Sequence, residues 1–305
     1  MSELLLSTDS LTKRYGRQKA VDQVSIHIRK GAVYGLIGRN GAGKTTLLKM
    51  ISGLAAPDGG EISLFGFSGR ELVRVRERIG CLIEGPGLYP SLSAADNLRL
   101  KCMLMGIKKK SYIDELLKIT GLYKARNKKA GKFSLGMKQR LGIAMALVGE
   151  PDLLILDEPI NGLDPQGIVE VRETLLKLNK EKDITMIISS HILEELSKIA
   201  TDYGIIHQGS LLQELSSEEL MKKCSERIEV VMDNPEQAIP VLDGLGFTEY
   251  QMIDKEKLYI YERLEDSPLV NMELVKHGIF VRSVGVTSGE LEDYFLQMTG
   301  GGANA

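Results

Sequence analysis

The sequence predicts an α/β protein built on a mostly parallel β-sheet. Three observations support this class. Short apolar runs typical of buried strands recur at residues 32–37, 79–83, 153–156 and 184–188. Helical spacing of apolar residues follows several of these runs, and strands that alternate with helices are typical of parallel sheets. Residues 90–150 break the alternation with helical patterns alone, which predicts an inserted helical subdomain.

Composition and charge narrow the class further. The chain has 305 residues, of which 43% are hydrophobic and 26% charged, so we expect two folded domains. A formal net charge of −2 gives no electrostatic case for nucleic-acid binding. No apolar run approaches the roughly 20 residues that span a bilayer, residues 1–6 lack a secretory signal, and Cys81, Cys102 and Cys224 are too scattered for a disulfide framework. We therefore expect a cytoplasmic protein that reaches a membrane only through a partner.

The first elements are predicted from residue alternation and from a glycine-rich turn. Val24, Ile26 and Ile28 alternate with polar residues and predict one half-buried strand. Residues 32–37 predict a buried strand, the turn follows, and residues 45–51 resume at helical spacing. The order strand, loop, helix is the setting that a phosphate-binding loop requires.

Small polar residues mark the expected helix starts further along the chain. Ser93 and Ser111, each followed three residues later by an aspartate, have the spacing of helix caps. Asp164 before Pro165 predicts another helix start, after the strand at residues 153–156.

The last ninety residues follow a different order, which is strand, helix, two strands, helix, strand. This pattern divides the chain near residue 215 and predicts a small α+β C-terminal domain at residues 216–305. The expected elements are residues 227–232, residues 235–245, two runs that surround Lys255 and Lys257, residues 267–277 and residues 280–286.

The glycine-rich turn carries the first chemical motif. Residues 38–45, Gly-Arg-Asn-Gly-Ala-Gly-Lys-Thr, satisfy the spacing glycine, four residues, Gly-Lys-Thr. Backbone N–H groups of such a loop cradle phosphate oxygens, Lys44 reaches the β- and γ-phosphates, and the Thr45 hydroxyl ligates Mg²⁺. The motif predicts a P-loop NTPase core that binds ATP. The residues expected to contact the nucleotide are Gly38, Asn40, Gly41, Gly43, Lys44, Thr45 and Thr46.

Two carboxylates end the buried strand at residues 153–156. They emerge where α/β sheets bind their ligands, at the C-terminal ends of the strands. Asp157 is suited to a water-mediated Mg²⁺ contact, and Glu158 to a general base that orients the attacking water. An acidic turn after a strand is common, so the pair indicates a site because the phosphate loop accompanies it.

With both motifs present, the chain resembles the ABC ATPase family. Residues 133–140, Phe-Ser-Leu-Gly-Met-Lys-Gln-Arg, are similar to that family's signature sequence. Ser134 and Gly136 match the family pattern, whereas Leu135 and Met137 replace its usual glycine and glutamine. Ser134 is also suited to cap the following helix and to present N–H groups to an anion. The resemblance implies that Ser134 and Gly136 bind nucleotide.

Three further positions match the family by order and spacing. Asp164, in Asn-Gly-Leu-Asp, resembles the D-loop aspartate, and helix capping is an equally good account of it. His191 matches the switch histidine that contacts the γ-phosphate and joins Lys44 and Glu158 in the expected catalytic set. Tyr15 matches the aromatic residue on which the adenine ring stacks.

One departure from the family pattern indicates a branch. The family normally places a glutamine after the strand at residues 79–83, and this chain has Glu84 there. Its carboxylate offers an oxygen to Mg²⁺ or water and adds a full negative charge, so the expected metal set is Thr45, Glu84 and Asp157. A glutamate at this position, together with the Phe-Ser-Leu-Gly-Met form of the signature, resembles the branch of the family that exports or clears lantibiotics and bacitracin. A generic exporter that tolerates a carboxylate is the alternative.

The resemblance covers residues 1–215 and implies an ABC-type nucleotide-binding domain there. The implied fold is a P-loop NTPase core with a mostly parallel sheet, an antiparallel β N-terminal subdomain, the inserted helical subdomain at residues 90–150, and the small C-terminal domain. Each ATP would lie between the phosphate loop of one copy and the signature of another. A homodimer is the economical arrangement, and a heterodimer is the alternative. The implied partner is a separate transmembrane permease, which places the chain at the inner face of the cell membrane.

Other classes fit the sequence less well. An ABC-type protein that acts on DNA ends carries a long heptad insertion, and a translation-factor type carries two ATPase units, and this chain has neither. Glu158 and His191 argue against a regulatory nucleotide-binding switch with little turnover. The alternative function is a soluble ABC-type ATPase switch that is not coupled to transport. Residues 291–295 resemble the end of the accessory domain of some exporter ATPases, whose role is either dimer contact or regulation.

Overall fold

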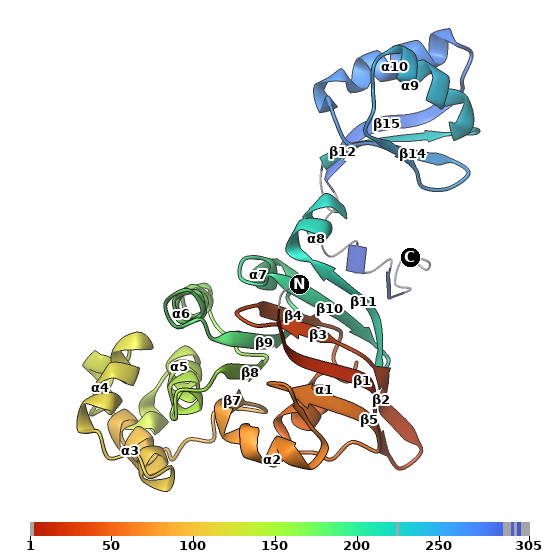
Figure 1. The fold of residues 1–305 in the computed structure, drawn as a ribbon. Coiled ribbons are helices and arrows are strands. Elements are labelled where there is room, and N and C mark those ends of the chain that lie inside the picture. The colour runs from red at the N-terminus through yellow and green to blue at the C-terminus, as the bar shows by residue number, and fades with distance from the viewer. Residues whose placement is uncertain (1–2, 224–225, 289–293, 296–297, 300–305) are drawn as a thin grey trace. The chain divides into compact units, whose positions relative to one another are not determined.

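A computed structural model describes residues 3–223, 226–288, 294–295 and 298–299 of the chain (Figure 1). The chain divides into two compact units, Met1–Ser217 and Glu218–Ala305. Cys224 and most of residues 291–295, which the sequence analysis singled out, lie outside the described residues.

A six-stranded sheet forms the centre of the first unit. Its strands are parallel except at one edge, where β11 runs antiparallel to β10. The prediction of a mostly parallel sheet is therefore confirmed. Across the sheet the order is β11 (Ser210–Ser216), β10 (Asp202–His207), β4 (Val33–Ile37), β9 (Thr185–Ser190), β8 (Leu153–Asp157) and β7 (Ile79–Leu82).

A second, antiparallel sheet is built around the first strand of the chain. Strand β1 (Leu4–Tyr15) pairs with three neighbours (Figure 1). Strand β6 (Phe67–Ser68) pairs with one of them and extends the sheet at one edge. This sheet is the expected antiparallel β N-terminal subdomain. The three neighbours of β1 are β2 (Gln18–Val24), β3 (His27–Arg29) and β5 (Gly59–Leu64).

The single strand expected from Val24 to Ile28 is wrong, because the chain breaks there into β2 and β3. Val24, Ile26 and Ile28 are all fully buried, as their alternation predicts. The break comes from Thr8 of β1, whose Oγ1 donates to the Val24 carbonyl and accepts from the Ile26 N–H, each at 3.0 Å. Hydrogen bonds to the Thr8 side chain thus take the place of backbone pairing between strands at this point. The alternation of apolar and polar residues does not predict such a tertiary contact.

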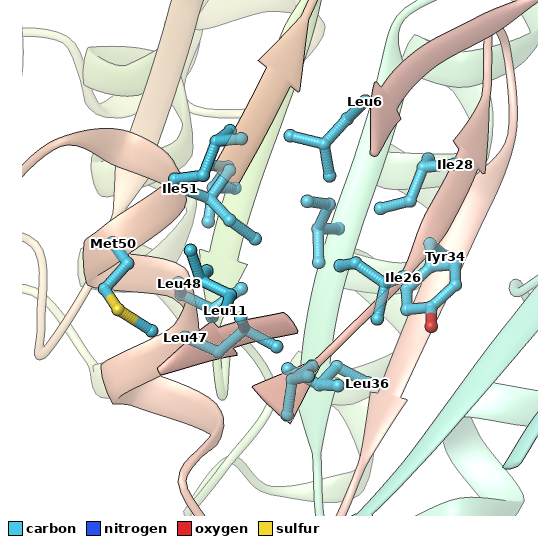
Figure 2. Close-up of a cluster of buried hydrophobic side chains, with 14 of the residues drawn as sticks. Leu6, Leu11, Ile26, Ile28, Tyr34, Leu36, Leu47, Leu48, Met50 and Ile51 are labelled. Carbon is cyan, nitrogen blue, oxygen red and sulfur yellow. The ribbon is translucent and has the colours of Figure 1, made fainter. Parts of the chain in front are cut away.

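Helix α1 (Lys44–Ser52) joins the two sheets through the hydrophobic core. It contacts β8 of the parallel sheet and β2 of the antiparallel sheet. Figure 2 shows Leu47 and Leu48 of this helix with Leu11 of β1 and Leu36 of β4, and all four side chains are fully buried. Because α1 packs against both sheets, its position is fixed. The position of the loop that precedes α1 is therefore fixed as well.

The helical subdomain contains α3 (Ala94–Leu104), α4 (Lys110–Ile119) and α5 (Leu135–Ala146). Ser93 caps α3 as predicted, with its Oγ accepting the Asp96 N–H at 3.1 Å. The cap predicted at Ser111 is wrong, because α4 already begins at Lys110. Asp114, the expected partner of Ser111, pairs with Arg126 instead.

The remaining helices of the first unit are short, apart from α6. They are α2 (Leu72–Val75), α6 (Pro165–Lys182) and α7 (Leu193–Ser197), with 3₁₀ turns η1 (Gly69–Glu71), η2 (Arg76–Arg78), η3 (Tyr123–Ala125) and η4 (Ala130–Lys132), and α8 (Ser217–Lys223) begins at the boundary between the units.

The second unit has the predicted order of elements, β-α-β-β-α-β. Its antiparallel sheet has the order β13 (Tyr250–Met252), β14 (Lys257–Ile260), β12 (Glu226–Met232), β15 (Val281–Ser288), which is that of a ferredoxin-like module. Helices α9 (Ile239–Gly244) and α10 (Ser267–Lys276), with turns η5 (Pro235–Ala238) and η6 (Leu264–Asp266), complete it. Ile228, Leu242 and Leu274 belong to a core of its own.

Candidate functional site

The phosphate loop follows β4 and leads directly into α1, as its chemistry requires. Gly41 and Gly43 adopt φ values of 80° and 108°, which residues with a Cβ rarely adopt. Gly38 has a different reason to be glycine, since a Cβ there would lie 2.6 Å from the carbonyl oxygen of Ile206. The loop backbone is therefore compact, and it places the N-terminus of α1 beneath the space where a phosphate would lie.

Lys44 is the first residue of α1 and is only 5% exposed. Its Nζ donates to the Gly38 carbonyl at 2.7 Å and lies 3.1 Å from Glu158 Oε1. The ammonium is therefore held inside the loop by a carbonyl and a carboxylate. A γ-phosphate would be a third anionic partner for the same group.

Thr45 and Asp157 meet across the end of the sheet. Thr45 Oγ1 donates to Asp157 Oδ2 at 2.8 Å, so two residues that are 112 positions apart share one contact. A hydroxyl and a carboxylate are hard oxygen ligands of the kind that Mg²⁺ prefers. Within the described part of the chain, no three His, Cys, Asp or Glu side chains gather into a metal cage. A Mg²⁺ ion that takes its other ligands from phosphate and water fits this pair.

Glu158 contacts both other members of the expected catalytic set. Its Oε2 lies 2.8 Å from His191 Nδ1, and its Oε1 faces Lys44. Oε1 is buried and accepts no hydrogen bond from the described residues, because the Lys44 contact has the distance of an ion pair but not the angle of a hydrogen bond. This oxygen therefore has capacity for a water molecule. The backbone of Glu158 has a φ of 50°, which is uncommon for a residue with a side chain.

A hollow of about 240 Å³ lies over the phosphate loop. Tyr15, Asn40, Thr46 and Glu158 are among the residues that line it. Tyr15 ends β1 and is 54% exposed, so its ring is available to a ligand in the hollow. The fold thus places Tyr15 at the same hollow as the phosphate loop.

The signature residues lie outside this hollow. Ser134 caps α5 by accepting the Met137 N–H at 3.3 Å, and buried Gly136 lies where a Cβ would be 3.5 Å from Gly167 of α6. Asp164 caps α6 by accepting the Gly167 N–H at 3.2 Å, so the capping account describes its contact. Neither Ser134 nor Gly136 lines the hollow that contains Lys44.

Glu84 has a contact that the sequence analysis missed. Its Oε1 lies 2.6 Å from Nζ of Lys49, which is one helical turn after Thr45 on α1. Glu84 also has a φ of 59°. In this structure the added negative charge is therefore matched by a lysine, while Thr45 and Asp157 contact each other.

The deciding observation comes from comparison with known proteins. A protein-family model described as ABC transporter matches residues 21–161. The bacitracin transport ATP-binding protein BcrA of Bacillus licheniformis is 43% identical over 306 residues, which cover 99% of each chain. The chain belongs to the ABC transporter family of ATP-binding proteins. ATP binding and ATP hydrolysis are therefore its activity, and the Lys44, Glu158 and His191 contacts lie in an ABC ATPase fold.

Two further comparisons extend this assignment. The lantibiotic transport ATP-binding protein SrtF of Streptococcus pyogenes is 44% identical over 211 residues, or 69% of this chain and 90% of that one. A dimeric ATP-binding cassette solved in a post-hydrolysis state with ADP and phosphate has a TM-score of 0.62 and 25% identity, covering 70% of this chain and 98% of that one. Among the residues described, no helix has both the length and the apolar character needed to span a membrane.

Proposed function

We propose that this chain hydrolyses ATP to drive a separate transmembrane permease that exports a peptide antibiotic. The observation that carries the proposal is the line of contacts from Lys44 through Glu158 to His191 beside the phosphate loop. Two relatives are named as transport ATP-binding proteins for bacitracin and for a lantibiotic, and both are over 40% identical to this chain. We place the chain at the cytoplasmic face of the membrane, bound through the permease.

The nucleotide would occupy the hollow over the phosphate loop. Tyr15 stacks on the adenine ring, the loop N–H groups hold the phosphates, and Lys44 turns from Glu158 toward the β- and γ-phosphates. Thr45 and Asp157 would hold Mg²⁺, which supplies charge neutralisation at the phosphates when it is bound. Glu84 is a further candidate for this set, and it would first have to leave Lys49.

Glu158 is the proposed general base. Its Oε1, which accepts no hydrogen bond from the described residues, would accept a proton from the attacking water, while His191 on Oε2 fixes the plane of the carboxylate. When Lys44 moves to the phosphate, Glu158 loses its cation and its carboxylate is free to orient water. The same shift therefore binds the nucleotide and releases the base.

A second copy of the chain completes the site. Ser134 and Gly136 lie outside the hollow of their own chain, and the cap of α5 offers backbone N–H groups that suit an anion. Two chains placed head to tail would bring the signature of each copy to the phosphate loop of the other. A homodimer needs no other ATPase subunit, and its closing on ATP and opening after hydrolysis is a two-state motion that a permease can follow.

Loss of the protein from its host cell tests the cargo class. We expect deletion to increase sensitivity to bacitracin or to a lantibiotic, wild-type protein to restore resistance, and Glu158→Gln to fail to restore it at equal expression. Unchanged sensitivity to every peptide antibiotic tested, with purified wild-type protein still hydrolysing ATP, would reject the cargo class and leave the ATPase assignment intact.

A further inference from the structure

Ser189 lies at the end of β9, directly beside the two carboxylates. In the parallel pairing of β8 with β9, Ser189 and Asp157 are register partners, so their side chains leave the same face of the sheet. Ser189 Oγ donates to Asp157 Oδ1 at 2.6 Å and accepts the N–H of Glu158 at 2.9 Å. One hydroxyl therefore contacts both acidic residues of the site.

The two contacts use both hydrogen-bonding functions of a buried group. Ser189 has no exposed surface, and a buried hydroxyl without partners destabilises a fold. Here the donor is directed to Asp157 and the acceptor to Glu158. Both hydrogen-bond partners of the Ser189 hydroxyl therefore belong to the candidate site, and neither belongs to β9.

These contacts fix geometry that ATP hydrolysis needs. Asp157 has Oδ1 bonded to Ser189 and Oδ2 bonded to Thr45, so its carboxylate plane is set from both sides. Glu158 follows with its left-handed backbone, and the Ser189 bond to its N–H holds that conformation. Without Ser189 the Asp157 carboxylate can rotate and the Glu158 backbone loses a restraint.

We propose that Ser189 is a positioning residue for ATP hydrolysis, which orients Asp157 toward Mg²⁺ and Glu158 toward the attacking water. The inference rests on the roles proposed above for these two carboxylates. It assigns Ser189 no contact with nucleotide. Its effect passes through Asp157 and Glu158.

The neighbouring residue supplies a matched control. Ser190 is also buried, at 1% exposure, and lies next to Ser189 in the same strand. Its Oγ accepts the Ile192 N–H at 2.9 Å and donates to the Ile192 carbonyl at 3.3 Å, so it serves the turn after the strand. Ser190→Ala removes the same atom at the same depth without touching either carboxylate.

The test measures how Mg²⁺ strengthens nucleotide binding, which needs no turnover. Full-length wild type, Ser189→Ala, Ser189→Thr and Ser190→Ala are titrated with Mg²⁺ in the presence of a fluorescent ADP analogue. We expect Ser189→Ala to need about tenfold more Mg²⁺ for half-saturation, because a hydrogen bond to a charged group is lost. Metal-free ADP affinity should be unchanged. Ser189→Thr keeps the hydroxyl and should restore the wild-type value.

Steady-state kinetics give the second measurement. The kcat for ATP should fall by about tenfold or more in Ser189→Ala, with a smaller change in KM, because Glu158 is misplaced for the chemical step. If the alanine variant does not fold, Ser189→Cys, a weaker donor, should show the same change in smaller measure.

Two results would overturn the inference. One is a wild-type Mg²⁺ requirement and kcat in Ser189→Ala, and the other is an equal loss in Ser190→Ala. Wild-type protein that hydrolyses ATP no faster than Glu158→Gln would instead reject the proposed base, so the two failures are distinguishable.

Discussion

Glu84 is one of the residues at which this chain departs from the ABC family pattern. Its carboxylate meets Lys49 at 2.6 Å on the surface of α1. The side chains of this pair are partly exposed, so the pair itself contributes little stability. Its effect is that the charge of Glu84 is balanced beside α1, the helix that follows the phosphate loop.

We predict that Glu84→Gln keeps substantial ATPase activity, whereas Glu84→Ala does not. Glutamine retains an oxygen that can bind Mg²⁺ or water once the side chain leaves Lys49, and alanine removes it. Phosphate release under saturating MgATP measures both variants. Equal activity in the two would remove Glu84 from the site.

A second prediction concerns the side chain of Tyr15, which lines the hollow over the phosphate loop. Tyr15→Ala should weaken ATP binding by about tenfold, because stacking of a base on an aromatic ring contributes about 1–3 kcal/mol. Tyr15→Phe keeps the ring and should bind ATP as wild type does. Calorimetric titration of both variants is the measurement, and an alanine variant with wild-type affinity would place the adenine elsewhere.

Residues within the motifs could be predicted from sequence, and their partners could not. The phosphate loop and the Asp157–Glu158 pair are local patterns whose spacing fixes their chemistry. Ser189 and Lys49 act through contacts that span 31 and 35 positions, to Glu158 and Glu84 respectively. Such contacts depend on strand register and on helix placement, which one-dimensional spacing does not contain. The only signal for Ser189 was a polar residue at the end of a buried strand.

The helix starts of the helical subdomain also show that residue spacing alone does not predict tertiary contacts. Ser93 and Ser111 have the same spacing to an aspartate, yet only Ser93 precedes a helix. The Ser93 hydroxyl also donates a hydrogen bond to Asp96 Oδ2 at 2.6 Å, and this bond lowers the pKa of Asp96. The aspartate three residues after Ser111 is instead engaged by Arg126.

This difference predicts unequal effects of two matched substitutions. Ser93→Ala should destabilise the subdomain by about 1 kcal/mol and lower its melting midpoint by about 2–4 °C, whereas Ser111→Ala should change it little. Thermal unfolding followed by circular dichroism measures both. The contribution from Asp96 is present near neutral pH and is lost as the pH falls below about 4, since its folded pKa is lowered. Equal shifts for the two variants would contradict the assignment of the cap.

The chain has an ABC ATPase fold, and its own signature residues lie outside the hollow over the phosphate loop. The first unit places Lys44, Asp157 and Glu158 together, but its signature serine caps a helix outside the hollow. We propose that a second copy supplies the signature residues to this hollow. The second unit has its own core, and its role in dimer contact or regulation stays a proposal.

Light scattering on purified wild type and Glu158→Gln, each with and without MgATP, tests this claim most directly. We predict that wild type hydrolyses ATP and stays mostly monomeric, while Glu158→Gln accumulates as an ATP-dependent dimer because the closed state cannot be released by hydrolysis. Phosphate release is followed in the same samples. A Glu158→Gln variant that stays monomeric with MgATP and hydrolyses it as fast as wild type would contradict both the base and the dimeric site.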